Sequence, residues 1–232
     1  MTDKNWFRRT SWTEEDQQDF FAHLERARRY NRAQYLQIQA SCLLATGLPR
    51  DAASAIELLD ILLRDHPDSV ETEGAHGLKA RCLEALGRID EAIDSYRLAL
   101  AARRTATNIH TYAPLSFGML VIRNERRDLY EEVLSAFNEM VGPVDLLFPD
   151  AQYMYFAVSA IILGEAGRMQ AARECAARAL RAASMTTTGL ARHPDIGLVK
   201  VRDKAIDAKL QRLIQPGSLD RIRSKWKEWR RG

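Results

Sequence analysis

Two His-Pro-Asp triplets carry the residue types best suited to acid–base chemistry. They are His66-Pro67-Asp68 and His193-Pro194-Asp195. A histidine beside a carboxylate can transfer protons at physiological pH, because its pKa lies close to neutrality. The simpler interpretation of each proline is a stop between two helices, which makes its neighbours turn residues. An enzymatic site around His193 stays open as an alternative, because a long connection surrounds it and such connections sometimes cover a site.

The three cysteines, Cys42, Cys82 and Cys175, stand at wide spacing, which predicts neither a disulfide framework nor a metal site. Cys42 and Cys82 each precede a glycine by five residues. We therefore expect both to be small buried core residues instead of redox thiols. The sequence also lacks a phosphate-binding loop, a nucleophile turn and a dinucleotide-binding turn. These observations predict no catalytic residue, no metal and no cofactor.

The end of the sequence is basic and amphipathic. Residues 200–232 contain eleven Lys/Arg and four Asp/Glu. Over 218–231, an apolar stripe at helical spacing is accompanied by basic residues on the other faces, namely Arg221, Arg223, Lys225, Lys227 and Arg230. A helix of this kind could lie on an anionic membrane or bind nucleic-acid phosphates. The simpler interpretation is a terminal cap whose Trp226 and Trp229 seal the last helices of the fold.

An internal repeat indicates the elements that position these residues. Gly47, Gly87 and Gly167 lie 40 and then 80 residues apart, each in a similar segment. Alanines recur seven residues before and five after the glycines: Ala40, Ala80, Ala160, Ala52, Ala92 and Ala172. We interpret each unit as two antiparallel helices that approach closely through the alanines and bend at the glycine. A further unit is expected to bend near residue 127, at Arg126-Arg127-Asp128.

Residues 86–100, LGRIDEAIDSYRLAL, closely resemble the second half of a tetratricopeptide repeat (TPR), and residues 165–180 are a weaker match. The resemblance covers roughly residues 31–185 and implies an all-α solenoid of about four stacked helical hairpins. The family repeat is about 34 residues long, which is shorter than the spacing between the glycines here. The resemblance therefore does not predict the shape of the groove. Segments 6–12, 32–40 and 188–199 also resemble small bacterial TPR proteins, which implies a bacterial origin.

We expect a single continuous domain in three parts. These are an N-terminal capping segment and helix over 1–30, the repeat array over 31–185, and a connection with two basic helices over 186–232. Thr13 precedes three acidic residues, an arrangement typical of a helix N-terminus. Aromatic residues before Thr13 are expected to pack beneath that helix. The last part is expected to form one helix from about Val199 to Ile214 and another from Ser218.

In such an array, the first helix of each hairpin lines a concave groove. Counting back from the bends gives the residues expected there: Gln34, Gln37, Ser41, Gly77, Arg81, Glu84, Gly118 and Ala157. Gly77, Gly118 and Ala157 are small, so we expect them to leave space for an extended peptide or an amphipathic helix. The Lys and Asn set by which some TPR proteins hold a peptide carboxylate is absent. The alternative is that the C-terminal helices fill the groove themselves.

The leading expectation is a bacterial cytoplasmic, non-enzymatic module that binds a protein or peptide, with neutralising or chaperoning one cognate partner as a plausible form. The sequence has no run of eighteen apolar residues, so we expect no membrane span. Its first residues also lack the pattern of a secretory signal. Binding of nucleic acid or anionic membrane through residues 218–231 is the first alternative. An enzyme that uses the His193 segment is the second.

Overall fold

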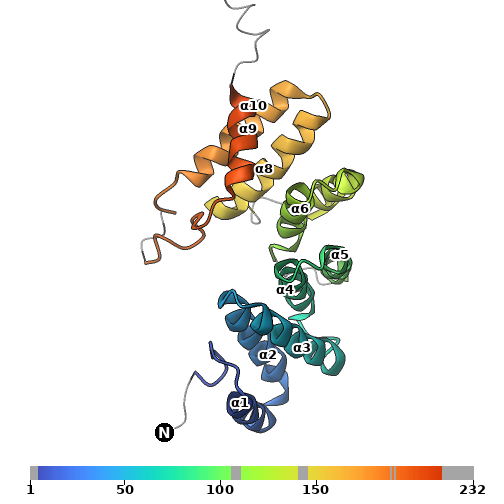
Figure 1. Cartoon of the computed structure of the whole chain (residues 1–232), viewed down its shortest axis with the longest axis vertical. Helices are drawn as coiled ribbons and strands as arrows, with labels where there is room; N and C mark the ends of the chain where they lie inside the picture. The colour runs from blue at the N-terminus through green and yellow to red at the C-terminus, as the bar shows by residue number, and fades with distance from the viewer. Residues whose placement is uncertain (1–4, 106–110, 141–145, 189, 191, 216–232) are drawn as a thin grey trace, which may run out of the picture. The chain divides into compact units, whose positions relative to one another are not determined.

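The computed structural model describes residues 5–105, 111–140, 146–188, 190 and 192–215. Within these ranges every regular element is helical, which confirms the predicted all-α class (Figure 1). The elements are α1 (Glu14–Arg26), α2 (Arg29–Ala45), α3 (Pro49–Asp65), α4 (Thr72–Ala85), α5 (Ile89–Thr105), α6 (Ala113–Arg123), a short 3-10 helix (Arg127–Leu129), α7 (Tyr130–Met140), α8 (Pro149–Glu165), α9 (Met169–Ala183) and α10 (Lys204–Ile214). None of the described helices has the length and apolar character that a membrane span requires.

The chain divides into two compact units, unit 1 over residues 1–117 and unit 2 over residues 118–232. The division falls inside α6, and each unit is described by itself. The three-part organisation expected from the sequence stays a prediction.

Two helical hairpins follow one another in unit 1. α2 packs against α3 and α4 packs against α5, while α4 also contacts α2 and α3 (Figure 1). The small residues expected at these contacts are at most 3% exposed: Ala40, Ala52, Ala80 and Ala92. Leu43 and Leu59, both fully buried, add apolar volume to the same core. Small side chains let helix axes approach closely, so this pattern accounts for tight packing of the hairpins.

A residue with a left-handed backbone conformation ends the first helix of each hairpin. Gly47 and Gly87 have φ values of 72° and 73°, and Gly167 of unit 2 has 74°. The Arg88 N–H donates to the Leu83 carbonyl at 2.9 Å, a bond that closes the end of α4. A Cβ on Gly87 would meet no atom within 4 Å. The glycines are therefore needed for their backbone conformation, as predicted, and not for space.

The third bend lies at Glu125, one residue before the predicted segment Arg126-Arg127-Asp128. Glu125 has a φ of 52°, and the Arg126 N–H donates to the Val121 carbonyl at 3.0 Å, as at the second bend. The sequence conceals this bend because a glutamate stands where the other bends have glycine. With the bend at Glu125, Gly118 lies seven residues before it and takes the position that alanine holds in the other units.

Unit 2 contains the α8–α9 hairpin, and α10 packs against both of its helices (Figure 1). Gly164 of α8 lies where the three helices meet. A Cβ on Gly164 would lie 2.9 Å from a methyl carbon of Leu213 on α10 and 3.7 Å from the Cβ of Ala172 on α9. The absence of a side chain at this position lets α10 seat on the hairpin.

α10 begins at Lys204, five residues later than the sequence predicts. The Asp203 side chain caps the helix and accepts hydrogen bonds from two backbone N–H groups of its first turn. Residues 197–203 therefore form an irregular segment that leads into the helix, and the prediction of a helix from Val199 is wrong. The last helix expected from the sequence, over 218–231, lies outside the described residues.

One buried glutamine holds the N-terminal segment on α2. The Gln39 side chain accepts a hydrogen bond from the Arg9 N–H at 3.0 Å and donates one to the Arg9 carbonyl at 2.8 Å. Trp6 packs nearby against Phe20 of α1 and Tyr35 of α2, with ring centroids 5.3 and 4.9 Å apart. The predicted packing of N-terminal aromatic residues against the first helix is confirmed.

A buried ion pair joins α4 to α5. The Arg103 Nη1 lies 3.4 Å from the Glu73 Oε1, and the two side chains are 7% and 1% exposed. The same Nη1 donates to the Thr111 carbonyl at 3.1 Å, and the Thr111 hydroxyl donates to Glu73 at 2.5 Å. These hydrogen bonds offset part of the cost of taking two charges out of water. The pair also fixes the residues that lead into α6.

The bends give opposite predictions for two substitutions. We expect Glu125→Gly to raise the free energy of unfolding by about 1 kcal/mol, because glycine adopts the left-handed conformation without the strain of a side chain. Loss of the exposed ion pair with Lys209 offsets only a few tenths of a kcal/mol. The reverse change, Gly87→Ala, should lower the free energy by about 1 kcal/mol. Urea unfolding of the three proteins measures both; a destabilised Glu125→Gly variant would contradict the assignment of the bend.

The glutamine contact predicts a local effect of Gln39→Leu. Both backbone groups of Arg9 lose their partners, so we expect a cost of about 2 kcal/mol and faster amide hydrogen exchange at Arg9. Trp6 should become more solvent-exposed, which shifts tryptophan emission to longer wavelength. Gln34→Leu, an exposed position on the same helix, is the control and should leave both signals unchanged. Equal rates of amide hydrogen exchange at Arg9 in the two variants would contradict the role of Gln39 in holding the N-terminal segment.

Candidate functional site

α2 presents a row of polar side chains to solvent in unit 1. Gln34 and Ser41 are exposed, as predicted for an accessible surface, and Gln37 is half-buried. Tyr30, which is 71% exposed, extends the row toward the start of the helix. The four residues follow at intervals of four, three and four, so they lie on one face of the helix. Sequence reasoning misses Tyr30, although counting back one more turn from Gln34 finds it.

α4 continues this surface beside α2. A Cβ on Gly74 would lie 2.4 Å from the Nε2 of Gln37, so the bare glycine backbone lets the Gln37 side chain lie across α4. Arg81, two turns further along α4, is exposed, and Glu84 is half-buried. Arg81 forms no ion pair within the described part of the chain. We call the following set the α2–α4 face: Tyr30, Gln34, Gln37, Ser41 and Arg81.

The small residues expected to leave space in a groove are buried instead. A Cβ on Gly77 of unit 1 would lie 3.6 Å from the Cβ of Ala113. In unit 2, Gly118 is buried and a Cβ on it would lie 3.0 Å from the ring of Phe137. Ala157 is also fully buried. The two glycines permit close packing of helices and Ala157 has no exposed surface, so the prediction that these three residues line an open groove is wrong.

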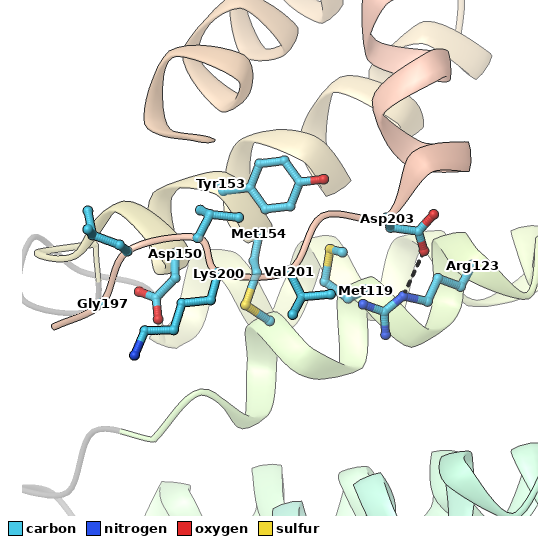
Figure 2. Close-up of a pocket in the computed structure, with 11 residues that line it drawn as sticks. Met119, Arg123, Asp150, Tyr153, Met154, Gly197, Lys200, Val201 and Asp203 are labelled. Atoms are coloured by element: carbon cyan, nitrogen blue, oxygen red, sulfur yellow. Dashed lines mark hydrogen bonds and ion pairs between the residues drawn. The ribbon is translucent and has the colours of Figure 1, made fainter. Parts of the chain in front are cut away.

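A pocket of about 440 Å³ lies in unit 2, between α6, α8 and residues 197–203 (Figure 2). Its lining combines apolar, aromatic and charged side chains, including Met119, Arg123, Tyr153, Met154, Lys200 and Val201. The volume falls within the range of pockets that bind ligands, and the pocket is open to solvent on one side.

The irregular segment that forms one wall of the pocket is fastened at both ends. The Gly197 carbonyl accepts a hydrogen bond from the Asp150 N–H at 2.8 Å. Gly197 has a φ of 69°, and a Cβ on it would lie 2.5 Å from the Cβ of Phe148, so a side chain does not fit. At the other end, Asp203 forms an ion pair with Arg123 at 3.2 Å. The wall is therefore held in place before any ligand binds.

Tyr153 is a fixed hydrogen-bond donor at the edge of this pocket. Its hydroxyl donates to the Asp207 carboxylate at 2.9 Å, and Arg202 forms an ion pair with the same carboxylate at 2.6 Å. Burial and the hydrogen bond to Asp207 raise the pKa of Tyr153. The hydroxyl stays protonated at physiological pH, so it orients its neighbours and does not act as a base.

The histidines of the two His-Pro-Asp triplets lie in turns. His66 is the C-cap residue of α3, in agreement with the interpretation of its proline as a stop. His193 is exposed and does not line the pocket of unit 2. An acid–base pair at His193 would require an enclosing pocket with a carboxylate within hydrogen-bond reach. The described geometry therefore does not support the enzyme alternative that used this segment.

Over the ranges that the structure describes, no group of three or more His, Cys, Asp or Glu could hold a metal ion. The basic surface considered as an alternative, Arg221, Arg223, Lys225, Lys227 and Arg230, lies outside the described residues.

The cysteines differ in their environments. Cys82 is fully buried, as expected, and burial raises its pKa to about 12. Cys42 is only half-buried, so the expectation that it is a core residue is wrong in part. Cys175 is half-buried as well, and burial raises its pKa.

Cys82 should therefore resist thiol reagents in the folded protein. With a pKa of about 12, about one thiol in 10⁴ is ionised at pH 8, and the side chain is out of reach. In the Cys42→Ser/Cys175→Ser variant we expect no reaction with a chromogenic disulfide reagent until denaturant is added. The Cys82→Ser/Cys175→Ser variant, which keeps the half-buried Cys42, is the comparison and should react in the folded state. Rapid labelling of Cys82 without denaturant would show that α4 is not packed as described.

Comparison with protein-family models, with curated proteins and with solved structures finds no match for the chain.

Proposed function

We propose that this chain is a non-enzymatic helical-repeat module of the tetratricopeptide type that binds a segment of a partner protein on the α2–α4 face. The exposed row on α2 carries the proposal. Tyr30, Gln34, Gln37 and Ser41 lie on one face of a helix whose opposite side is buried in the hairpin. Each member of the row can donate and accept hydrogen bonds, so the row suits a peptide backbone.

The composition of the face favours a protein partner. Tyrosine and arginine supply much of the binding energy at protein interfaces, while short polar residues adapt to the partner. Tyr30 is preorganised, because the Arg28 Nη1 donates to its hydroxyl at 2.9 Å. Arg81 lacks an ion-pair partner within the described residues, so its guanidinium is available for a carboxylate of the bound segment.

The repeat architecture supports the same function. Three of the bends with a left-handed residue lie at Gly87, Glu125 and Gly167. At each of them, the N–H of the next residue donates a hydrogen bond to the carbonyl four residues before the bend. Small residues occur seven positions before all four bends. Stacked hairpins of this kind keep the first helices in a row and leave one face of each for binding. A solenoid of about four TPR-like hairpins is therefore the architecture that we propose.

The decisive experiment is affinity capture from a lysate of the native host. Wild-type protein should retain a partner that the Arg81→Glu variant loses, because replacing an interface arginine by a carboxylate costs about 2 kcal/mol or more. Arg168→Glu, the same change at an exposed residue of unit 2, is the matched control and should retain the partner. Gln34→Ala and Ser41→Ala should each weaken retention by a smaller factor.

An unchanged set of captured proteins in the Arg81→Glu variant would contradict the proposal. A variant that ends at residue 217 separates the proposal from the basic-helix alternative. Loss of binding in that variant alone, together with a steep decline between low and moderate salt, would favour nucleic acid or anionic membrane as the ligand.

A further inference from the structure

We infer that the pocket of unit 2 is a second binding site, which takes a large apolar side chain from an extended acidic segment of a partner protein. The inference does not rest on the α2–α4 face, because its residues and unit are different. It follows from the lining of the pocket, the exposed surface beside it and the unpaired Lys200 at its rim.

The lining of the pocket suits an apolar side chain. Met119 of α6 is 3% exposed and Met154 of α8 is half-buried, and Figure 2 draws both among the residues that line the pocket. Thioether side chains are flexible and polarisable, so they adapt to aliphatic and aromatic groups of different shape. The wall formed by residues 197–203 is fixed at Gly197 and Asp203, so the pocket exists before binding.

Exposed apolar residues around the pocket point to a protein segment and not to a small molecule. Val201 lines the pocket and is 87% exposed, and Ile196, next to the segment, is 46% exposed. Small-molecule sites usually enclose most of the ligand, whereas this pocket is open on one side. A small ligand inside the pocket would cover only the part of Val201 that lines it. A peptide that inserts one side chain and lies along the segment would cover it.

One unpaired cation at the rim favours an acidic segment. Four charged residues line the pocket, the cations Arg123 and Lys200 and the carboxylates Asp150 and Asp203. Both carboxylates are already engaged, because Asp203 forms an ion pair with Arg123 and Asp150 accepts a hydrogen bond from the Ala151 N–H at 2.7 Å. Lys200 is exposed at the pocket and forms no ion pair within the described residues. Figure 2 shows Lys200 at the end of the segment opposite to the Asp203–Arg123 pair, so its ammonium is left for a carboxylate of the partner.

Methionine methyl signals test this inference on the full chain. The protein has six methionines, and selective ¹³C labelling of their methyl groups gives six reporters. Met154→Leu and Met119→Leu assign the two pocket signals. The probe is an eleven-residue peptide with one central phenylalanine flanked by aspartate and glutamate. We expect it to shift the Met119 and Met154 signals and to leave Met169 of α9 unchanged, with weaker binding as salt is raised.

Matched peptides and variants separate the two parts of the recognition. Glycine in place of the phenylalanine should weaken binding by about tenfold or more, because the apolar anchor is lost. Lysine in place of the acidic residues should abolish binding. Val201→Asp and Lys200→Glu should each weaken it by about fivefold or more, and both residues are exposed enough to leave the fold intact. Arg81→Glu makes the same charge change in unit 1 and should bind the peptide like wild type.

Three outcomes with the peptides would overturn the inference. These are pocket signals that do not move at millimolar peptide, equal affinity for the acidic and basic peptides, and unchanged affinity in both Val201→Asp and Lys200→Glu. Stronger displacement of the pocket signals by a single-stranded oligonucleotide than by the acidic peptide would also overturn it, since the partner would then be a nucleic acid. Retention of the acidic peptide by Arg81→Glu, with loss of the captured host protein, would show that the two sites act separately.

Discussion

The left-handed bend between paired helices is the constraint on which the rest of the structure depends. It closes the first helix by a backbone hydrogen bond and turns the chain so that the second helix packs back on the first. Small residues can then meet at the contact, and apolar side chains fill the remaining space. Because this packing uses the buried sides of α2 and α4, their opposite sides are left for polar residues. The accessible face thus follows from the bend.

The all-α class and the helical hairpins could be predicted from the sequence because their determinants are local and repeated. Glycines at fixed intervals mark three bends, and alanines at fixed offsets mark the helix contacts. Glu125 breaks this rule, since nothing in a glutamate indicates a positive φ. The start of α10 is also concealed. Both an early helix and a cap at Asp203 are compatible with the residues around it, and tertiary contacts of residues 197–203 decide between them.

The candidate sites were predictable to different degrees. Gln34, Ser41 and Arg81 lie on exposed helix faces because helical periodicity fixes the direction of a side chain. Gly77 shows the limit of this reasoning. A small residue is compatible with an open groove and with a close helix contact, and the choice depends on Ala113, which is distant in sequence. The pocket of unit 2 could not be predicted, since its walls come from three elements whose spacing carries no period.

The buried pair of Glu73 and Arg103 has a consequence for how unit 1 reaches its native alignment. If α5 slid along α4 by one turn, the guanidinium would leave its carboxylate while both remained in a low-dielectric interior, at a cost of several kcal/mol. An apolar pair would tolerate the same shift with little change in energy. We therefore expect the ion pair to act against misregistered packing of α5 on α4 more than it adds to the free energy of unfolding.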